Sequence, residues 1–303
     1  MHLHVRLYAI LMAPLVLLSL SLRPDVVPVR AGEVLPMPVN VYHAGSLNGA
    51  VTEMQPGFTA ATGYPLLDSS SGSVAIANEI HDGVKTPDVF MSADAEVNQV
   101  LMGPENGNKV RWYFIMARNR VVLTSNPQSR FKADLEAAAA GTNPGTRCCK
   151  VQASVSSVVT SKTTSVSAND LAELQSPGFR FERGDPATDP LAYRSVFVMQ
   201  LAEQCYQQPG LADRVLGGND NPAQIAANPP GDVQQGLADA STSYLSSAME
   251  GGQPYITLPE AVDLSNPALG STDAGASYTS PLGQTFHGTP TGLQRDDPAY
   301  GSE

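Results

Sequence analysis

The sequence predicts an α/β fold with a parallel sheet, and three observations support this prediction. Short apolar runs typical of strands alternate with segments whose apolar residues recur at helical spacing. Small polar residues stand at the junctions, and 26 glycines and 24 prolines supply many turns. The chain has 303 residues, of which 42% are hydrophobic, so it is long enough for about two domains with a sizeable core.

The first half of the chain carries the alternating pattern most clearly. We expect strands at 38–44, 63–68 and 86–92, followed by a strand or strand pair at 112–124. A strand–helix–strand series of this kind packs as a parallel sheet with helices on both faces. The apolar positions of the three intervening helices are Leu47, Ala50, Val51, Met54 and Phe58, then Val74, Ala77, Ile80 and Val84, then Val97, Val100 and Leu101.

The second half is less regular. Residues 137–170 contain few large apolar side chains and have no clear period, so we expect a loop or an insertion there. Beyond Ser271 the chain is rich in Gly, Ser, Thr and Pro and is expected to add little to the core. Between these segments we expect a strand at 178–183, a helix at 191–206, short helices at 221–228 and 233–238, and a strand at 255–259.

The N-terminus has the pattern of an export signal. Residues 7–22 form an apolar run that follows Arg6, and they are too few to span a membrane, which takes about 20 residues. Small residues before position 32 favour cleavage after Ala31, so residues 1–31 are predicted to be a signal peptide. The alternative is an uncleaved anchor. No cysteine is close enough for lipid attachment, which favours a free periplasmic protein.

Composition excludes several classes of function. The 29 acidic residues outnumber the 18 basic ones, and this argues against nonspecific binding to nucleic acid or to an anionic membrane. The five histidines and three cysteines lack the spacing of a zinc site, so we expect no resident metal. Of the adjacent Cys148 and Cys149, one could pair with Cys205. No nucleophile has a paired base, so an exported hydrolase is a weak alternative and we expect no enzyme activity.

Four polar residues stand between a strand and a helix, namely Ser46, Ser73, Asp94 and Asp189. Each is a good N-cap, and Pro190 suits the first position of the helix after Asp189. In a parallel sheet the carboxyl ends of the strands share one edge, where helix N-termini present free N–H groups. This arrangement favours a small oxyanion site, although simple helix capping also accounts for the four residues.

Five motifs follow one another in the chain: HAGSL at 43–47, SGSV at 71–74, DVFMSAD at 88–94, GFRF with DPATDP and AYR at 178–194, and YITLP at 255–259. They fall within a stretch from about residue 38 to residue 270, and together they are more specific than any one alone. In this order they resemble a known family, the substrate-binding proteins of molybdate and tungstate ABC transporters.

The resemblance implies a type II periplasmic-binding-protein fold with the ligand in a cleft between two lobes. Lobe 1 is expected to contain residues 38–124 with 246–303, and lobe 2 residues 125–245. The implied ligand is molybdate or tungstate, held without a cofactor, and the implied partner is a membrane permease. We expect a monomer that does not bind nucleic acid. The implied ligand-binding residues are Gly45, Ser46, Gly72, Ser73, Asp189, the Leu191 N–H, Tyr193 and the position of Ser243.

Two departures from the family qualify this expectation. In its archaeal branch an aspartate at position 189 and a later glutamate bind the metal directly, but the glutamate position falls on Ser243 here. A hydrogen-bonded, more nearly tetrahedral ion is therefore expected. The family also continues with a further strand and helix, so we hypothesise a truncation or a change of reading frame. The alternatives are a binder of sulfate, thiosulfate or another small oxyanion, and a truncated relative that does not bind.

Overall fold

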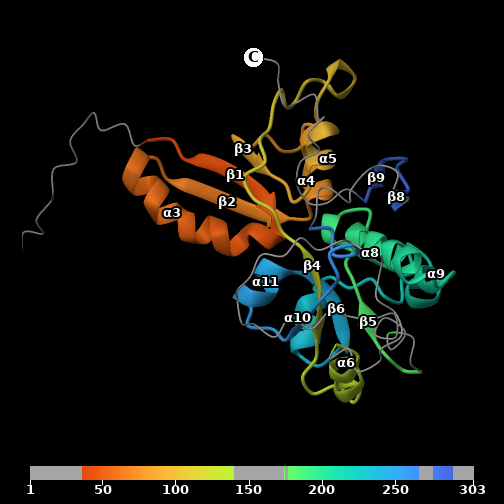
Figure 1. Ribbon diagram of the computed structural model, residues 1–303. Coiled ribbons are helices and arrows are strands. Elements are labelled where there is room, and N and C mark those ends of the chain that lie inside the picture. The colour runs from red at the N-terminus through yellow and green to blue at the C-terminus, as the bar shows by residue number, and fades with distance from the viewer. Residues whose placement is uncertain (1–35, 140–173, 175–176, 266–275, 289–303) are drawn as a thin grey trace, which may run out of the picture. The chain divides into compact units, whose positions relative to one another are not determined.

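Two β-sheets, a β-hairpin and the helices around them make up the part of the chain that the structure describes (Figure 1). This computed structural model describes residues 36–139, 174, 177–265 and 276–288. Residues Pro38–Glu303 form one unit, distinct from Met1–Met37. The predicted α/β class is confirmed. The signal peptide predicted for 1–31 and most of the irregular 137–170 stretch lie outside the described residues.

The first sheet is parallel, with strand order β2-β1-β3, as the alternating pattern predicts. Its connections are helical, and α3 ends at Gly63, whose φ of 76° suits a glycine at the end of a helix. The elements in chain order are β1 (Val39–Ala44), η1 (Gly45–Leu47), α3 (Asn48–Thr62), β2 (Leu66–Ser71), α4 (Ser73–His81), β3 (Val89–Met91), α5 (Ala95–Gln99) and η2 (Pro104–Asn106).

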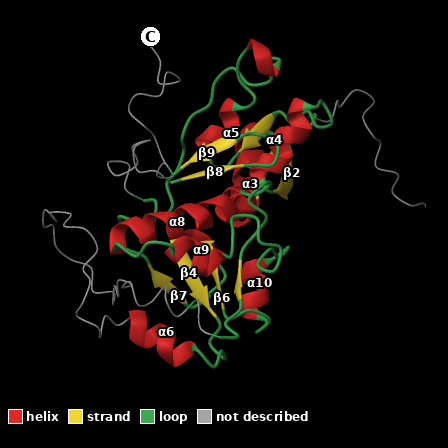
Figure 2. Ribbon diagram, turned by 90° about the vertical axis from the view of Figure 1, so that its right-hand side faces the viewer, coloured by secondary structure: helices red, strands yellow, loops and turns green. Residues whose placement is uncertain are grey.

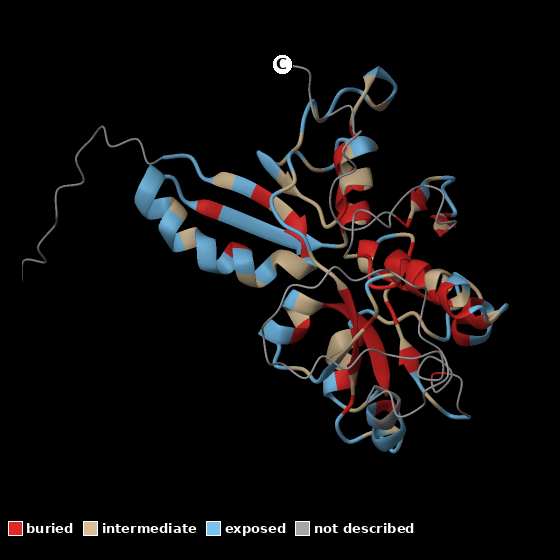
Figure 3. Ribbon diagram, viewed as in Figure 1, coloured by how far each residue is buried: buried red, intermediate tan, exposed pale blue. Residues whose placement is uncertain are grey.

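One side of this first sheet has only a small core. Val51 is the buried residue of α3, and it packs with Val41 and Leu66 in a separate cluster. The remaining residues of β2 are exposed (Figure 3). The expected apolar face of α3 is thus only partly buried, and Met54 is 43% exposed.

The second sheet is mixed, with strand order β5-β6-β4-β7. β4 runs antiparallel to β6 and β7, while β5 runs parallel to β6. The strand expected at 112–124 begins only at residue 121, so that prediction was too long. Its elements are β4 (Val121–Ser125), α6 (Lys132–Ala139), β5 (Phe181–Glu182), α10 (Pro229–Gln234), β6 (Ala240–Tyr244), α11 (Leu245–Glu250) and β7 (Tyr255–Thr257).

Helix α8 (Pro190–Tyr206) lies beside the second sheet (Figure 2) and is buried along most of its length (Figure 3). It is followed by α9 (Leu211–Leu216), which packs on it. The helix expected at 221–228 is wrong, because Asn221 begins a turn there and its side chain donates to the Leu216 carbonyl at 2.8 Å. The helix expected at 233–238 begins earlier, after the Asn228 cap.

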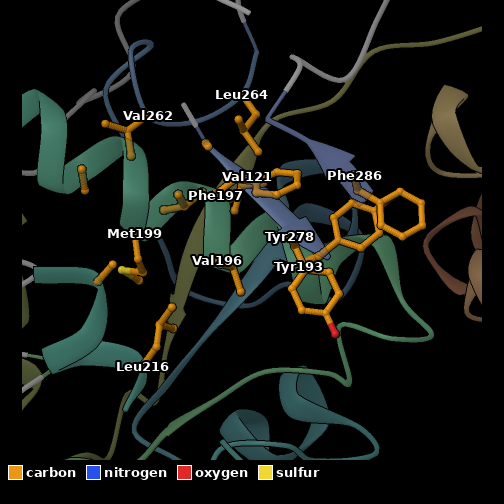
Figure 4. Packing of buried hydrophobic residues seen from close by; sticks show 14 of the residues in the cluster. Val121, Tyr193, Val196, Phe197, Met199, Leu216, Val262, Leu264, Tyr278 and Phe286 are labelled. Atoms are coloured by element: carbon orange, nitrogen blue, oxygen red, sulfur yellow. The ribbon is translucent and has the colours of Figure 1, made fainter. Parts of the chain in front are cut away.

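The hairpin of β8 (Ser277–Thr279) and β9 (Thr285–His287) corrects the expectation that the tail adds little to the core. Tyr278 and Phe286 are each 1% exposed. Their rings stack on Tyr193 of α8, with centroids 6.4 Å and 4.5 Å away (Figure 4). Two buried aromatic residues thus attach an otherwise polar and partly exposed segment to the core. Among the described residues, the helices are too short or too polar for a membrane span.

Candidate functional site

Three candidate residues follow the carboxyl ends of the strands in the first sheet. The register pairs Ala44 of β1 with Ser71 of β2, and the residue after Met91 of β3 is next to them in the same row. Ser46, Ser73 and Asp94 each stand two residues beyond this row. The parallel register therefore brings the three residues to one edge of the sheet, as the sequence predicts.

The capping predictions for these junctions are confirmed for the two aspartates. Asp94 accepts a hydrogen bond from the Glu96 N–H at 3.0 Å, and Asp189 accepts one from the Leu191 N–H at 2.9 Å. For the serines the predictions are wrong. Gly72 is the N-cap of α4 and Ala44 that of η1, and neither makes a side-chain cap.

The Ser73 hydroxyl is instead engaged with the turn after β3. Its Oγ accepts a hydrogen bond from the Ala93 N–H at 3.0 Å, and Ser73 is fully buried. Within the described ranges we find no acceptor for the Ser73 proton. Among the residues that the structure describes, the Ser73 hydroxyl is therefore used as an acceptor and not as a donor.

The first turn of α4 meets the loop that precedes α8. The Ala75 N–H donates to the Thr188 carbonyl at 3.3 Å. Gly72 lies so close to Thr188 that a Cβ at Gly72 would collide with the same carbonyl oxygen. A glycine is thus required where these two segments touch. The Thr188 carbonyl accepts the hydrogen bond of the Ala75 N–H, which has no partner within the helix.

A buried network joins α8 to the turn after β3. Arg194 is 2% exposed, and its Nη2 lies 2.8 Å from Asp94 Oδ2. Its Nη1 donates to the Ala93 carbonyl at 2.9 Å and to the Tyr244 hydroxyl. The Tyr193 hydroxyl donates to Asp94 Oδ2 at 2.6 Å. The Arg194 Nε is buried without a hydrogen-bond partner in the described structure.

Burial sets the protonation of this network. Burial by itself lowers the pKa of Arg194, but the adjacent Asp94 carboxylate reverses this and the net pKa shift is upward. Burial raises the pKa of Tyr244 to about 12 and, together with Asp94, raises that of Tyr193. Both tyrosines therefore remain donors. Burial also raises the pKa of Asp189, despite the Leu191 N–H and Arg194.

The structure gathers most of the predicted ligand-binding residues. Gly72 and Ser73 meet the loop that ends at Asp189, and Leu191 and Tyr193 follow on α8. Gly45 and Ser46 lie at the same sheet edge by register. The Leu191 N–H, however, is already bound by Asp189.

Ser243 is not part of this group. It lies on β6 beside Tyr244, so its side chain points to the opposite face of the sheet from the tyrosine that binds Arg194. Its hydroxyl donates to the Tyr244 carbonyl at 3.2 Å.

Sequence reasoning did not assign roles to Arg194 and Tyr244. The available signal was an arginine within the apolar run of a buried helix, where a charge needs a partner. No cluster of three or more metal-ligating side chains is found among the described residues. Cys205 is disulfide-bonded, as the sequence allowed, and the candidates Cys148 and Cys149 lie outside the described residues.

Comparison with known proteins gives the class to which this fold and site belong. Residues 39–277 match the model of the bacterial extracellular solute-binding protein family. The chain belongs to this family, whose members are solute-binding proteins and not enzymes.

Individual relatives point to transport. A Haloferax volcanii protein, described provisionally as an ABC transporter molybdenum-binding protein, is 31% identical over 261 residues, covering 86% of this chain and 72% of its own. An uncharacterized solute-binding protein of Methanoculleus marisnigri is 27% identical over 290 residues, covering 87% and 71%. The chain is therefore a solute-binding protein of the kind that serves ABC transporters.

Solved structures give more distant matches. The periplasmic molybdate-binding protein of Azotobacter vinelandii is 19% identical, with a TM-score of 0.43 over 69% of this chain and 72% of its own. The sulfate-binding protein SubI of Mycobacterium tuberculosis is 15% identical, with a TM-score of 0.45 over 77% and 78%.

Proposed function

We propose that the protein captures molybdate or tungstate outside the cytoplasm and delivers it to the permease of an ABC transporter. The observation that carries this proposal is the buried Ser73 hydroxyl, whose proton has no acceptor among the described residues and which lies at a sheet edge shared with Ser46. The Haloferax relative, with its molybdenum-binding description, supports the same ligand. Export through the 1–31 signal, a periplasmic location and a monomeric state belong to the proposal.

The chemistry of the donors suits a fully deprotonated oxyanion. The Ser73 hydroxyl and the Ala75 N–H are donors, and the anion would take the place of the Thr188 carbonyl at that N–H. Molybdate and tungstate carry no proton at neutral pH and need only donors. Hydrogen phosphate keeps a proton, which a donor-only site leaves without a partner.

Asp189 is the acidic member of the proposed ligand-binding residues, and its Oδ1 is engaged by the Leu191 N–H at 2.9 Å. Burial raises the pKa of its carboxyl, although the Leu191 N–H and Arg194 oppose this shift.

Isothermal titration of the protein with molybdate, tungstate and sulfate in parallel tests the proposal. We expect tight binding of the first two and weak binding of sulfate. Tight sulfate binding would change the ligand to another small oxyanion. No binding of any of the three by a folded protein would contradict the proposal and favour a relative that does not bind.

Serine variants test the site itself. A hydrogen bond to a charged group is worth about 1.5–3 kcal/mol, so Ser46→Ala and Ser73→Ala should each weaken binding roughly 10- to 150-fold. Ser69→Ala is the matched control, because Ser69 is an exposed serine of the same sheet. Unchanged affinity in the first two variants would remove both serines from the site.

A further inference from the structure

The turn at residues 93–94 holds Ser73 in place, and Arg194 holds this turn. The Ser73 Oγ accepts a hydrogen bond from the Ala93 N–H, and the Ala93 carbonyl accepts one from Arg194 Nη1. The next side chain, Asp94, accepts from Arg194 Nη2. A single buried guanidinium thus binds the turn 93–94 twice, at the backbone carbonyl of Ala93 and at the carboxylate of Asp94.

This contact determines how the Ser73 hydroxyl can be used. A hydroxyl has one proton to donate and lone pairs that accept. The Ala93 N–H engages one of the two lone pairs of the oxygen. A hydroxyl that already accepts one hydrogen bond is a stronger donor and a poorer acceptor of a second one. If the turn 93–94 relaxed, both lone pairs would be open to a hydrogen bond from a ligand.

We propose that Arg194 is a positioning residue that sets the selectivity of the oxyanion site. By holding the Ala93 N–H against Ser73, it keeps Ser73 a donor and favours fully deprotonated oxyanions over hydrogen phosphate. This inference rests on the proposed function and adds a determinant of ligand choice outside the residues that contact the ligand.

A double-mutant cycle between Arg194 and Ser73 tests the proposal. Arg194→Lys keeps the positive charge but loses the planar fork that reaches Ala93 and Asp94 together. We expect Arg194→Lys to lower the ratio of molybdate to phosphate affinity about tenfold, the equivalent of one hydrogen bond. In a Ser73→Ala background the same change should leave that ratio unaltered, because residues that act through one another are not additive.

A purely structural role would give a different result. Arg194→Lys would then lower both affinities together, with the same loss when Ser73 is alanine, and that outcome would overturn the proposal. Arg183→Lys is the matched control, since Arg183 is also a buried arginine but bonds Gly218 and Gln224 instead. It should reduce stability and leave the selectivity ratio unchanged.

A milder variant covers the case in which Arg194→Lys does not fold. Tyr244→Phe removes the hydroxyl that Arg194 Nη1 contacts and leaves the Arg194–Asp94 pair intact. It should lower the selectivity ratio in the same direction by a smaller factor. An unchanged ratio in a folded Tyr244→Phe variant would count against the proposal.

Measurements without ligand separate this inference from the proposed function. With alanine-selective nitrogen labelling, the Ala93 amide should be protected from hydrogen exchange in the parent protein. Protection should fall in both Ser73→Ala and Arg194→Lys. If the parent binds none of the oxyanions, the proposed function fails, and the amide still decides whether Arg194 positions Ser73. Unchanged protection in Arg194→Lys would overturn that role.

Discussion

Strands β2 and β6 are both rich in serine, yet five of the six residues of β2 are exposed whereas all of β6 is buried. β2 is at an edge of its sheet, and α3 covers it with little more than Val51. β6 lies between β5 and β4, beside the buried helix α8. Position in the sheet, and not composition, decides the environment of each strand.

The difference shows where the stability of the protein is concentrated. The large cluster includes residues of α8, β4, β6 and the hairpin, while the cluster below β1 and α3 has three buried members. Some buried polar side chains of this region bond to one another in pairs, such as Thr124 with Ser241 and Thr242 with Ser195. The candidate site lies between a firmly packed helix and a lightly packed sheet.

The largest expected effect is at Asp94, which joins the first sheet to α8. Asp94→Ala would leave the buried Arg194 without its acid, and breaking such a pair costs about 3–5 kcal/mol. The control is Glu79→Ala, because the Glu79 side chain is 41% exposed where it pairs with Lys85. Losing this pair should lower the unfolding free energy by about 1 kcal/mol or less. Chemical denaturation measures both. Equal losses would show that the contact between α8 and this turn contributes little.

The next effect compares two phenylalanines, one from each region. Phe197 of α8 is fully buried, and Phe197→Ala should cost about 3–5 kcal/mol of unfolding free energy. Phe58 of α3 is only partly buried, so Phe58→Ala should cost about 1 kcal/mol. Urea unfolding of the two variants decides the matter. A larger loss at Phe58 would reverse the ranking of the two cores.

A smaller effect concerns the serine-rich strands directly. Thr242→Val on β6 removes a hydroxyl that bonds Ser195 and should cost about 1 kcal/mol. Ser69→Ala on β2 removes an exposed hydroxyl and should change stability by less than about 0.5 kcal/mol. Thermal unfolding at one pH compares the pair. The contrast between the strands fails if Ser69→Ala is the more costly change.

The smallest effect is a pH dependence at Asp189. Burial raises its folded-state pKa above the ordinary 3.8, so the folded chain holds this proton to higher pH than the unfolded chain. Stability from this group is therefore lost as pH rises from about 3.8 through the raised pKa. Asp189→Asn lacks this loss and can still cap α8. Its unfolding free energy relative to the parent should increase over that range, and a constant difference would contradict the assignment.

Particular residues show what the sequence could and could not predict. The parallel order of β1, β2 and β3 followed from strand and helix periodicity, and it placed Ser46, Ser73 and Asp94 at one edge. The sequence does not predict the network around Arg194, because its partners Asp94 and Tyr244 are far away in the sequence. Long-range pairing between polar side chains leaves no local period.

The expectation that the segment beyond Ser271 adds little to the core was wrong for a similar reason. Tyr278 and Phe286 are two aromatic residues in a polar segment, and only their stacking on Tyr193 makes that segment part of the core. The separation of Ser243 from the site has the same origin. A motif alignment gives its position along the strand but not the face of the sheet on which it lies.

The β8–β9 hairpin also determines how late in synthesis the core can be completed. The His287 N–H binds the Glu96 carboxylate across 191 residues of sequence, and Phe286 completes the stack on Tyr193. At the usual pace of translation, the stretch of about 90 residues between Tyr193 and Phe286 takes about 5–20 s to be made. Throughout that interval the nascent chain leaves the aromatic face of α8 uncovered, and this apolar surface is covered only when the hairpin emerges.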